Sequence, residues 1–370
     1  METKKYRFDE VTINFDKKRI PLSSAQREKR QGTFRYYGAQ GVIDHVDDYI
    51  YDGTYLLIAE DGENLKSKKQ NIAQVVDGQF WVNNHAHIVQ GNEQSDTRFL
   101  CYLINSMDLS GYVTGSAQPK LSQANLNAIT LSLPTLVEQK RIVEYLYMLD
   151  QKIDVNRQIN DNLADLLQTV YQERFGDTSL IANQGILSDI CSYSRDKVAV
   201  SELNVSTYFS TENMLSGKAG STEATSLPTT SQTTACHKGD TLISNIRPYF
   251  KKIVYCEDNC GCSTDVLCFT PSQPCYSAYL FSTLYADKFF AFMVAGSKGT
   301  KMPRGDKQQI MTYPVVLPSE EELAGFNTIA SPLLEQIYSN SAENKRLSIL
   351  RDTLLPKLMS GEIDVSAIQL

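Results

Sequence analysis

Five cysteines lie close together late in the chain, and thiolates at short spacing are common ligands of zinc. They are Cys256, Cys260, Cys262, Cys268 and Cys275. Zinc sites usually pair their cysteines as C-x2-C, whereas the first three cysteines here follow C-x3-C-x-C. The stretch CGCSTDVLCF is also apolar and strand-like, and a free cysteine in such a stretch packs as a small hydrophobe. The pattern therefore favours reduced, structural cysteines over a metal site.

Two histidines, His85 and His87, stand two residues apart in the strand-like stretch WVNNHAHIV. On a strand they would share one face, as a metal pair requires, but the sequence offers no third ligand. Ordinary strand histidines are therefore the favoured interpretation. The alternative, a metalloenzyme that uses the histidines and the late cysteines, predicts stoichiometric zinc in the purified protein.

Motifs of common catalytic sites are missing from the sequence. It contains no dinucleotide-binding glycine loop, no P-loop, no serine nucleophile elbow and no H-E-x-x-H helix. It also lacks the Asn/Asp-Pro-Pro-aromatic tetrapeptide of amino-methyltransferases. The nearest string, Arg247-Pro248-Tyr249, has no amide or carboxylate to polarise a target amine. The sequence therefore predicts no catalytic residue, no cofactor and no metal.

Basic side chains in loops, interleaved with tyrosines, are the residues of this sequence best suited to bind nucleic acid. Lysine, arginine and the amides of glycine-rich loops bind phosphate oxygens, and arginine and tyrosine contact base edges or stack. A single basic cluster more often marks a solvated loop, so the prediction depends on recurrence in both halves of the chain. The residues predicted to contact nucleic acid are Lys17, Lys18, Arg19, Arg35, Tyr36, Lys66, Lys68, Lys69, Lys120, Arg247, Tyr249, Lys251, Lys252, Lys298, Lys301 and Arg304.

The net charge of −7 at pH 7 does not exclude a nucleic-acid partner. Residues 1–134 carry a net charge of −1 and residues 179–316 a net charge of +1. The excess negative charge lies in residues 135–178, at −3, and in residues 317–370, at −4. Since local basic loops set the field at a contact, the two long blocks remain suitable for binding phosphate.

The composition is that of a globular protein with two or three domains. The 370 residues are 42% hydrophobic and 21% charged. No apolar run is long enough to span a bilayer, and the N-terminus METKKYRFDE lacks the apolar core of a signal peptide. Together with reduced cysteines, these features predict a cytoplasmic protein with no membrane contact.

A long amphipathic pattern occurs twice, 184 positions apart, at residues 134–170 and 318–354. Each copy opens with a capping box, Thr135 to Glu138 and Ser319 to Glu322. Apolar positions then step by four and three over about four heptads, which is typical of a coiled coil. A proline in the second copy, Pro332, predicts a kink or a restart of that helix. The alternative is one amphipathic helix used twice for ordinary core packing.

Asparagines interrupt both apolar seams at the same two places, and this sets a register. The residues are Asn156, Asn160, Asn340 and Asn344. In an antiparallel pair, residues whose numbers sum to about 500 face each other, so Asn156 meets Asn344 and Asn160 meets Asn340. The same register stacks leucines and isoleucines elsewhere, and its weak layer sets Arg351 beside Leu149, where the guanidinium must extend outward.

The repeat continues upstream of both helices. Gly115-Ser116 and Lys120-Leu121 align with Gly296-Ser297 and Lys301-Met302 at an offset of 181. The expected fold is α+β: two globular α/β domains separated by an antiparallel two-helix coiled coil, with an internal pseudo-twofold repeat. The predicted segments are a globular domain at 1–134, a helical region at 135–178, a second globular domain at 179–316 and a second helical region at 317–370.

This layout resembles the specificity (S) subunit of type I restriction–modification systems. The stretches that carry the resemblance are LSLPTLVEQKRIVEYLYMLDQKIDVNRQI, NHAHIV, TGSAQPKLSQANL and LRDTLLPKLMSGEIDV. The second helical copy departs from the first, because Glu-Glu replaces Glu-Gln and Leu334 takes the place of Asp150.

The resemblance implies a non-catalytic subunit in which each recognition domain reads one half of a bipartite site in double-stranded DNA. It implies that the helices space these domains and dock two adenine methyltransferase subunits, with translocase–nuclease subunits joining later. The rival is a solitary DNA- or RNA-binding scaffold that recruits another effector. A neighbouring gene carrying Asn-Pro-Pro-Tyr/Phe would separate the two.

Overall fold

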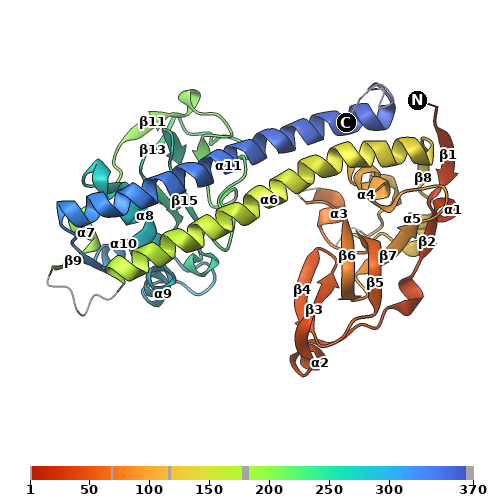
Figure 1. Cartoon of the computed structure of the whole chain (residues 1–370), viewed down its shortest axis with the longest axis horizontal. Helices are drawn as coiled ribbons and strands as arrows, with labels where there is room; N and C mark the ends of the chain where they lie inside the picture. Colours follow the sequence, from red (N-terminus) through yellow and green to blue (C-terminus); the bar gives the residue numbers. More distant parts are fainter. Residues whose placement is uncertain (1, 68–69, 116–117, 177–182, 364–370) are drawn as a thin grey trace. The chain divides into compact units, whose positions relative to one another are not determined.

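The computed structural model describes residues 2–67, 70–115, 118–176 and 183–363. The chain forms two compact units, of which unit 1 comprises residues 1–153 with 345–370 and unit 2 comprises residues 154–344. Two long helices, α6 (Leu136–Phe175) and α11 (Glu320–Ser360), each contribute residues to both units (Figure 1). The fold is thus mixed helix and sheet, with a long helix between the two globular parts of the sequence.

Unit 1 is built on a six-stranded sheet of order β2-β7-β5-β6-β3-β4, in which only β3 and β6 pair in parallel. A two-stranded sheet joins β1 to β8. The strands are β1 (Lys4–Arg7), β2 (Thr12–Asn14), β3 (Gln31–Gly38), β4 (Gly41–Val46), β5 (Tyr51–Ala59), β6 (Ala73–Val82), β7 (Ala86–Gly91) and β8 (Thr130–Leu133). The helices and 3-10 turns are α1 (Phe8–Val11), η1 (Asp16–Lys18), α2 (Ser24–Glu28), α3 (Asn64–Ser67), α4 (Thr97–Ser106), η2 (Ser110–Tyr112) and α5 (Gln123–Asn127).

Unit 2 holds two four-stranded sheets, β10-β17-β14-β15 and β11-β13-β16-β12, and a two-stranded sheet of β18 and β9. Its strands are β9 (Gln184–Ile186), β10 (Cys191–Tyr193), β11 (Lys197–Ala199), β12 (Tyr208–Phe209), β13 (Gln232–Cys236), β14 (Thr241–Ser244), β15 (Ile253–Tyr255), β16 (Cys260–Cys262), β17 (Val266–Pro271) and β18 (Pro314–Val316). Its helices and turns are α7 (Leu187–Ile190), η3 (Val200–Glu202), η4 (Pro248–Phe250), η5 (Pro274–Tyr276), α8 (Ser277–Tyr285), α9 (Asp287–Ala295) and α10 (Lys307–Ile310).

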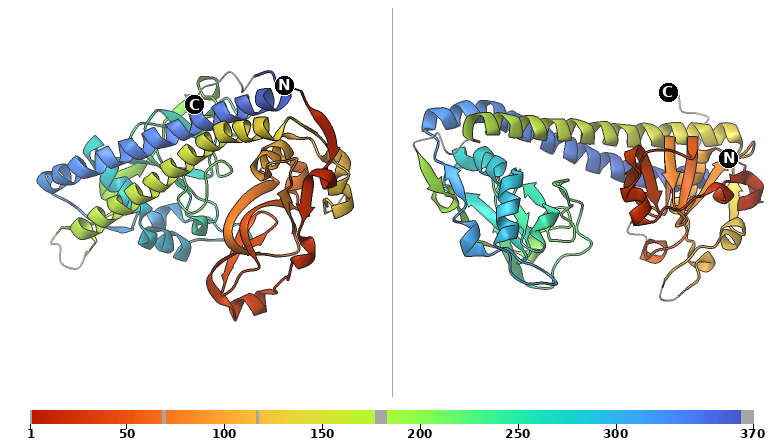
Figure 2. Two further views of the ribbon diagram at one scale, coloured as in Figure 1. Left: turned by 45° about the vertical axis from the view of Figure 1, so that its right-hand side comes forward. Right: turned by 90° about the horizontal axis from the view of Figure 1, so that it is seen from below.

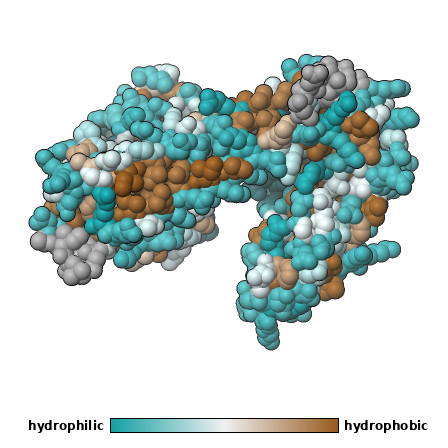
Figure 3. All heavy atoms as spheres, viewed as in Figure 1, coloured by the Kyte–Doolittle hydropathy of each residue, from teal (hydrophilic) through white to brown (hydrophobic). Residues whose placement is uncertain are grey.

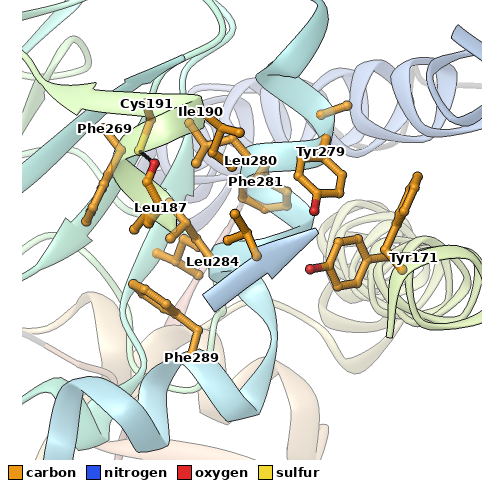
Figure 4. Packing of buried hydrophobic residues seen from close by; sticks show 14 of the residues in the cluster. Tyr171, Leu187, Ile190, Cys191, Phe269, Tyr279, Leu280, Phe281, Leu284 and Phe289 are labelled. Atoms are coloured by element: carbon orange, nitrogen blue, oxygen red, sulfur yellow. Dashed lines mark hydrogen bonds between the residues drawn. The ribbon is translucent and has the colours of Figure 1, made fainter. Parts of the chain in front are cut away.

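Both units share one antiparallel strand series, β2-β7-β5-β6 in unit 1 and β10-β17-β14-β15 in unit 2. Within each unit the strands lie to one side of the long helices (Figure 2). In unit 2 the helix side of the core is aromatic: Tyr171 of α6 faces Tyr279 of α8 (Figure 4), and their ring centroids are 5.7 Å apart. The Tyr279 hydroxyl donates to the Val316 carbonyl at 2.7 Å, which ties α8 to β18.

The long helices begin as the sequence predicts. Thr135 and Ser319 each cap the third amide of their helix, and the carboxylates of Glu138 and Glu322 accept from the cap amides at 2.9 and 2.8 Å. Both capping boxes are confirmed. The predicted restart at Pro332 is wrong, because α11 continues through it, as a helix can when packing holds both of its flanks.

The stretch WVNNHAHIV is not one strand, contrary to the prediction. It is the end of β6, a turn, and the start of β7. The Asn83 side chain accepts from the His85 amide at 2.8 Å, and this local bond competes with the strand ladder and closes the turn. His85 is therefore exposed in the turn while His87 is buried in β7, so the two rings do not share a strand face.

Candidate nucleic-acid interface

Two loops of unit 1 are held together at the end of β5. The loop that follows β5 turns at Gly62, and a second loop runs from Thr114 to Lys120. The Leu121 amide donates to the Glu60 carbonyl at 2.8 Å, and the Gly62 amide donates to the Pro119 carbonyl at 3.1 Å. Thr114 and Lys120 exchange two backbone bonds of 2.8 Å, which close the second loop. We call this arrangement the loop crossing of unit 1.

Unit 2 repeats the loop crossing at the end of β14. The Gly305 amide donates to the Asn245 carbonyl at 3.2 Å, and the Arg247 amide donates to the Pro303 carbonyl at 2.8 Å. Lys298 and Arg304 exchange two backbone bonds, of 2.9 and 3.0 Å. Each bond has its counterpart in unit 1, so the two crossings have the same backbone frame.

The frame corrects the predicted register of the repeat upstream of the helices. Thr114 and Lys120 correspond to Lys298 and Arg304, which is an offset of 184 and not 181. Gly115 therefore matches Gly299, and both have positive φ, +85° and +101°. Gly296, the predicted match, has φ of −90°. Only the correct pair shares the backbone conformation that favours glycine.

Cations and one carboxylate converge at the loop crossing of unit 1. Glu60 pairs with Arg19 at 2.9 Å and with Lys120 at 3.2 Å. Burial alone would raise the pKa of Glu60, but the bonds from Arg19 and Lys120 outweigh it, and the pKa lies below its usual value. The Lys66 ammonium donates to the Gly115 carbonyl at 2.8 Å, which joins α3 to the second loop.

Arg19 is committed to the interior, contrary to its prediction as a nucleic-acid contact. Its guanidinium donates to Glu60 and, at 2.9 Å, to the Ala86 carbonyl, and its side chain is 17% exposed. Its neighbours Lys17 and Lys18 are exposed. Arg19 therefore fixes the position of η1, whose two lysines face solvent.

A buried histidine locks η1 to the loop crossing. His87 is 1% exposed; its Nε2 donates to the Leu121 carbonyl at 2.8 Å and its Nδ1 lies 2.7 Å from Asp16 Oδ2. Asp16 also accepts from the Ile88 amide at 2.8 Å, so it acts as a carboxylate and the ring must donate from both nitrogens. Burial would lower the pKa of His87, but the bonds to Asp16 and Leu121 outweigh it and raise the pKa.

Of the predicted neighbours Arg35 and Tyr36 in unit 1, one is exposed and the other is buried. The Tyr36 ring is fully buried and its hydroxyl accepts from the Leu22 amide at 2.9 Å, so Tyr36 supports the fold and does not reach a ligand. The Arg35 side chain is exposed and donates to the Asp77 carbonyl at 2.6 Å. Lys68 and Lys69 lie outside the described residues.

The loop crossing of unit 2 gathers most of its predicted cations. Lys298 is 81% exposed and pairs with Asp306 at 2.5 Å, and Arg304 is 55% exposed and pairs with Asp265 at 2.9 Å. Lys301 is exposed on the same loop. Arg247, Tyr249 and Lys251 reach this loop through the bond between the Arg247 amide and Pro303.

Lys218 lies beside the same loop with its side chain only 16% exposed, and sequence reasoning missed it. Its amide donates to the Lys251 carbonyl at 2.9 Å, and the Lys218 and Lys251 ammonium groups bind Asp287 at 2.7 and 2.9 Å. The surrounding glycines in SGKAGS were the available signal. Lys252 turns the other way: its ammonium donates to the Thr211 carbonyl at 2.6 Å, and burial lowers its pKa. Lys252 is therefore a structural lysine.

Comparison with known proteins fits this geometry. Residues 2–164 match the family model of the type I restriction modification DNA specificity domain. This part of the chain is thus similar to a DNA specificity domain of that family. The match confirms for this domain the resemblance seen in the sequence.

Relatives extend the match in sequence and in fold. The Haemophilus influenzae protein named type I restriction enzyme specificity subunit S.HindORF215P is 36% identical over 138 residues, 37% of this chain and 35% of that protein. The type I restriction enzyme EcoprrI specificity subunit of Escherichia coli is 26% identical over 125 residues, 33% of this chain and 30% of that protein. The chain thus matches about a third of the length of these relatives.

The crystal structure of a type I restriction–modification S subunit from M. genitalium shares the fold. It superposes with a TM-score of 0.59 at 16% identity, over 97% of this chain and 96% of that one. The likeness confirms the predicted fold class, since it covers both globular parts of the sequence and both long helices.

The two long helices meet through asparagines in unit 2. Asn156 Nδ2 donates to Asn344 Oδ1 at 2.9 Å, and Asn340 Nδ2 donates to Asn160 Oδ1 at 2.8 Å. Both pairs have residue numbers that sum to 500, as an antiparallel register requires. Asn160 also donates to the Ile337 carbonyl, at 3.2 Å. Each of the four amides therefore has a hydrogen-bond partner in the other helix.

In unit 1 the corresponding layer is ionic. Arg351 was expected to extend outward beside Leu149, but its guanidinium donates to Asp150 Oδ1 at 2.7 Å. The Tyr102 hydroxyl of α4 donates to Asp150 Oδ2 at 2.5 Å. One carboxylate thus joins both long helices to the sheet-bound helix of the specificity domain, and the pKa of Tyr102 is raised by burial and by this bond.

The long helices also expose large apolar side chains. In unit 2 they are Val155, Ile159, Leu166, Ile329 and Tyr338, each between 38% and 48% exposed. Figure 3 shows apolar side chains gathered in a band where α6 and α11 run through unit 2. Contiguous exposed apolar surface on a helix commonly marks a protein-binding face.

Four of the five late cysteines pack as the sequence predicts, in one apolar cluster of unit 2. Its members include Cys236, Cys256, Cys260, Cys262 and Cys268, and Cys275 is exposed. Within the described residues no group of three His, Cys, Asp or Glu side chains is arranged to hold a metal ion. Among the helices that the structure describes, none has the length and apolarity needed to cross a bilayer.

Proposed function

We propose that this chain is the DNA sequence-specificity subunit of a type I restriction–modification complex, and that each loop crossing binds one half of a bipartite site in double-stranded DNA. One observation carries the proposal: the same loop crossing is built twice, with cations around it, in a chain whose first copy matches a DNA specificity domain. Two unlike readers on a repeated scaffold suit an asymmetric site of two parts.

The exposed cations of the crossings contact phosphate in this proposal. In unit 1 they are Lys17, Lys18, Lys66 and Lys120, with Arg35 of β3, and in unit 2 they are Lys298, Lys301 and Arg304. The half-buried Arg247 and Lys251 lie beside them in unit 2, whereas the Lys218 side chain is only 16% exposed and holds Asp287. Such contacts supply affinity and orientation but little sequence information. They also make binding fall steeply as salt increases.

The long helices supply the docking surface for partner subunits. Their exposed apolar residues favour two adenine methyltransferase subunits as partners, with translocase–nuclease subunits completing the complex. The chain then needs no cofactor or catalytic residue of its own and works in the cytoplasm. The helical regions 135–178 and 317–370 separate recognition domains 1–134 and 179–316, a division supported by the bounds of α6 and α11.

The methylome of the source cell, sequenced with and without this gene, tests the proposal. A two-part methyladenine motif that disappears on deletion is the expected result, and it also names the recognised sequence. An unchanged methylome, with DNA or RNA still bound by the purified chain, would favour the solitary scaffold. Methyl transfer from labelled S-adenosylmethionine by the purified chain alone would contradict a non-catalytic role.

A further inference from the structure

The side chains of the first turn of the loop crossing face different ways in the two units. In unit 1 the Leu65 amide donates to the Gly62 carbonyl at 3.2 Å, and in unit 2 the Phe250 amide donates to the Arg247 carbonyl at 2.9 Å. With the bonds to Pro119 and Pro303, these contacts make Asn64 and Leu65 the counterparts of Tyr249 and Phe250 in the common frame.

Burial of these counterparts is opposite. Asn64 and Leu65 are 5% and 3% exposed, and Leu65 belongs to the apolar core of unit 1. Tyr249 and Phe250 are 50% and 39% exposed. Unit 2 therefore presents two aromatic rings to solvent at a place where unit 1 uses its side chains to build the fold.

Backbone strain holds the rings outward. Arg247 and Lys251, which flank η4, have φ of +49° and +51°, a region that residues other than glycine seldom occupy. Unit 1 places Gly62, with φ of +121°, where unit 2 places Arg247. Retaining side chains at such positions is typical of sites that bind a ligand.

The turn is also rigid. Gly217 and Lys218 donate to the carbonyls of Phe250 and Lys251 at 2.8 and 2.9 Å, and Pro248 is buried beneath the turn. The Tyr249 and Phe250 rings pack on each other, with centroids 4.7 Å apart and planes at 56°. A preorganised pair of rings loses little conformational freedom on binding.

Cations surround the rings and identify the partner. Lys218, Arg247 and Lys251 flank the turn, and the adjoining loop carries Lys298, Lys301 and Arg304. The carboxylates paired with them are Asp265, Asp287 and Asp306, so cations remain in excess. The Tyr249 hydroxyl can donate to a phosphate oxygen, but the apolar faces of both rings cannot, and such faces pack on bases and on the methyl group of thymine.

We infer that Tyr249 and Phe250 form an apolar tip that contacts bases within the DNA half-site of unit 2, while the surrounding cations hold the phosphates. The inference rests on the proposed function and adds which residues of unit 2 determine sequence. In unit 1 the counterparts Asn64 and Leu65 are buried, so the two units read their half-sites by different chemistry.

Selection from a pool of random-sequence DNA duplexes, with the full chain, tests the tip. Wild type should enrich a two-part motif. The double change Tyr249→Ala with Phe250→Ala should keep the half read by unit 1 and lose sequence preference at one or more positions of the other half. Affinity for the wild-type motif should fall on the order of 10- to 100-fold, with an unchanged salt slope.

Matched variants separate a base contact from other roles. Tyr249→Phe keeps both rings and should retain the motif, whereas Lys301→Ala should keep the motif and lower the salt slope. The inference is wrong if the double variant loses both half-motifs or enriches the unchanged motif. It is also wrong if the double variant keeps the motif but fails to assemble with methyltransferase subunits. No enriched motif with wild type would instead contradict the proposed function itself.

Discussion

The two loop crossings share their backbone bonds and differ in what fills them. In unit 1 a charged network of His87, Asp16, Glu60 and Arg19 lies under the crossing. In unit 2 the position of His87 is taken by Leu267, which is 2% exposed, and the position of Glu60 by Asn245. Backbone hydrogen bonds do not depend on which side chains are present. The side chains beneath and on the surface of the crossing can therefore differ between the two units.

Of the substitutions that test this comparison, replacement of His87 should have the largest effect on stability. His87→Leu copies unit 2 into unit 1 but leaves buried Asp16 with only the Ile88 amide and Arg19, which lies 3.6 Å away, so unit 1 should lose about 3 kcal/mol of stability. Hydrogen exchange should show faster opening of unit 1 and an unchanged unit 2. His85→Leu, at an exposed position, is the control and should cost less than about 0.5 kcal/mol. Equal loss in the two variants would contradict the role of the network.

The asparagine layers of unit 2 invite a second test, because unit 1 uses an ion pair instead. Asn160→Leu strands the amide of Asn340 against leucine and should cost roughly 1–3 kcal/mol in the free energy of unfolding. Adding Asn340→Leu should restore part of that loss, since an apolar layer replaces a broken amide pair. Denaturant unfolding measures both variants. Equal damage from the single and double changes would contradict the pairing.

The buried network predicts that pH acts on the two units differently. The folded pKa of His87 is raised, so its stabilisation is complete below its unfolded pKa and is lost as pH rises through the folded value. Asp16 has a lowered folded pKa, so its stabilisation is present above its unfolded pKa and is lost as pH falls through the folded value. The groups facing His87 are Asp16 of η1, Glu60 after β5, and Arg19 and Lys120, which pair with Glu60.

Unit 1 should therefore weaken as pH rises through the neutral range while unit 2 should not. Above about pH 8.5 unit 2 loses stability of its own, because burial raises the folded pKa of cysteines such as Cys191 above that of the unfolded thiol. Residue-resolved hydrogen exchange, corrected for the intrinsic pH dependence of amides, measures the difference. In His87→Leu the neutral-range loss should disappear. A neutral-range loss of the same size in both units would show that it arises elsewhere.

Lys120 and Arg304 occupy the same place in the two crossings and offer a matched pair. Lys120→Ala and Arg304→Ala should each lower the salt slope of DNA binding by about one and weaken binding to every sequence alike. Removing charge at Lys298 and Lys301 as well should lower the slope further. A changed sequence preference with an intact slope would make these residues base readers and not phosphate contacts.

The smallest expected difference lies between Gly115 and Gly299. Both need positive φ, so alanine should cost roughly 1 kcal/mol at each. A Cβ at Gly115 would meet the Gln118 carbonyl at 2.2 Å, whereas a Cβ at Gly299 would have 3.5 Å to the Met302 carbonyl. Thermal unfolding should therefore show the larger loss for Gly115→Ala.

The sequence predicts features that depend on spacing. The capping boxes, the asparagine register and the recurrence of basic loops all follow from residue positions along one helix or in one repeat. Asn156 could be matched to Asn344 because a slipped register would set an amide against leucine.

Features that depend on the tertiary environment could not be predicted. Tyr36 and Tyr249 both stand beside basic residues, yet one is buried under Leu22 and the other is exposed on a strained turn. His87 reads as an ordinary strand residue until Asp16, 71 positions away, is placed beside it. The glycine register failed because positive φ cannot be read from the letters of the sequence.

The division of the long helices between the units has a consequence for synthesis. Unit 2 is one continuous stretch of chain, whereas unit 1 needs residues from both ends. Leu358, near the C-terminus, packs in the same core as Ile142 and Leu146. On the ribosome, unit 2 can therefore close its core while unit 1, although made first, waits with an apolar helix face uncovered. The usual order in which N-terminal domains mature first is reversed, and chaperone demand falls on the half made earliest.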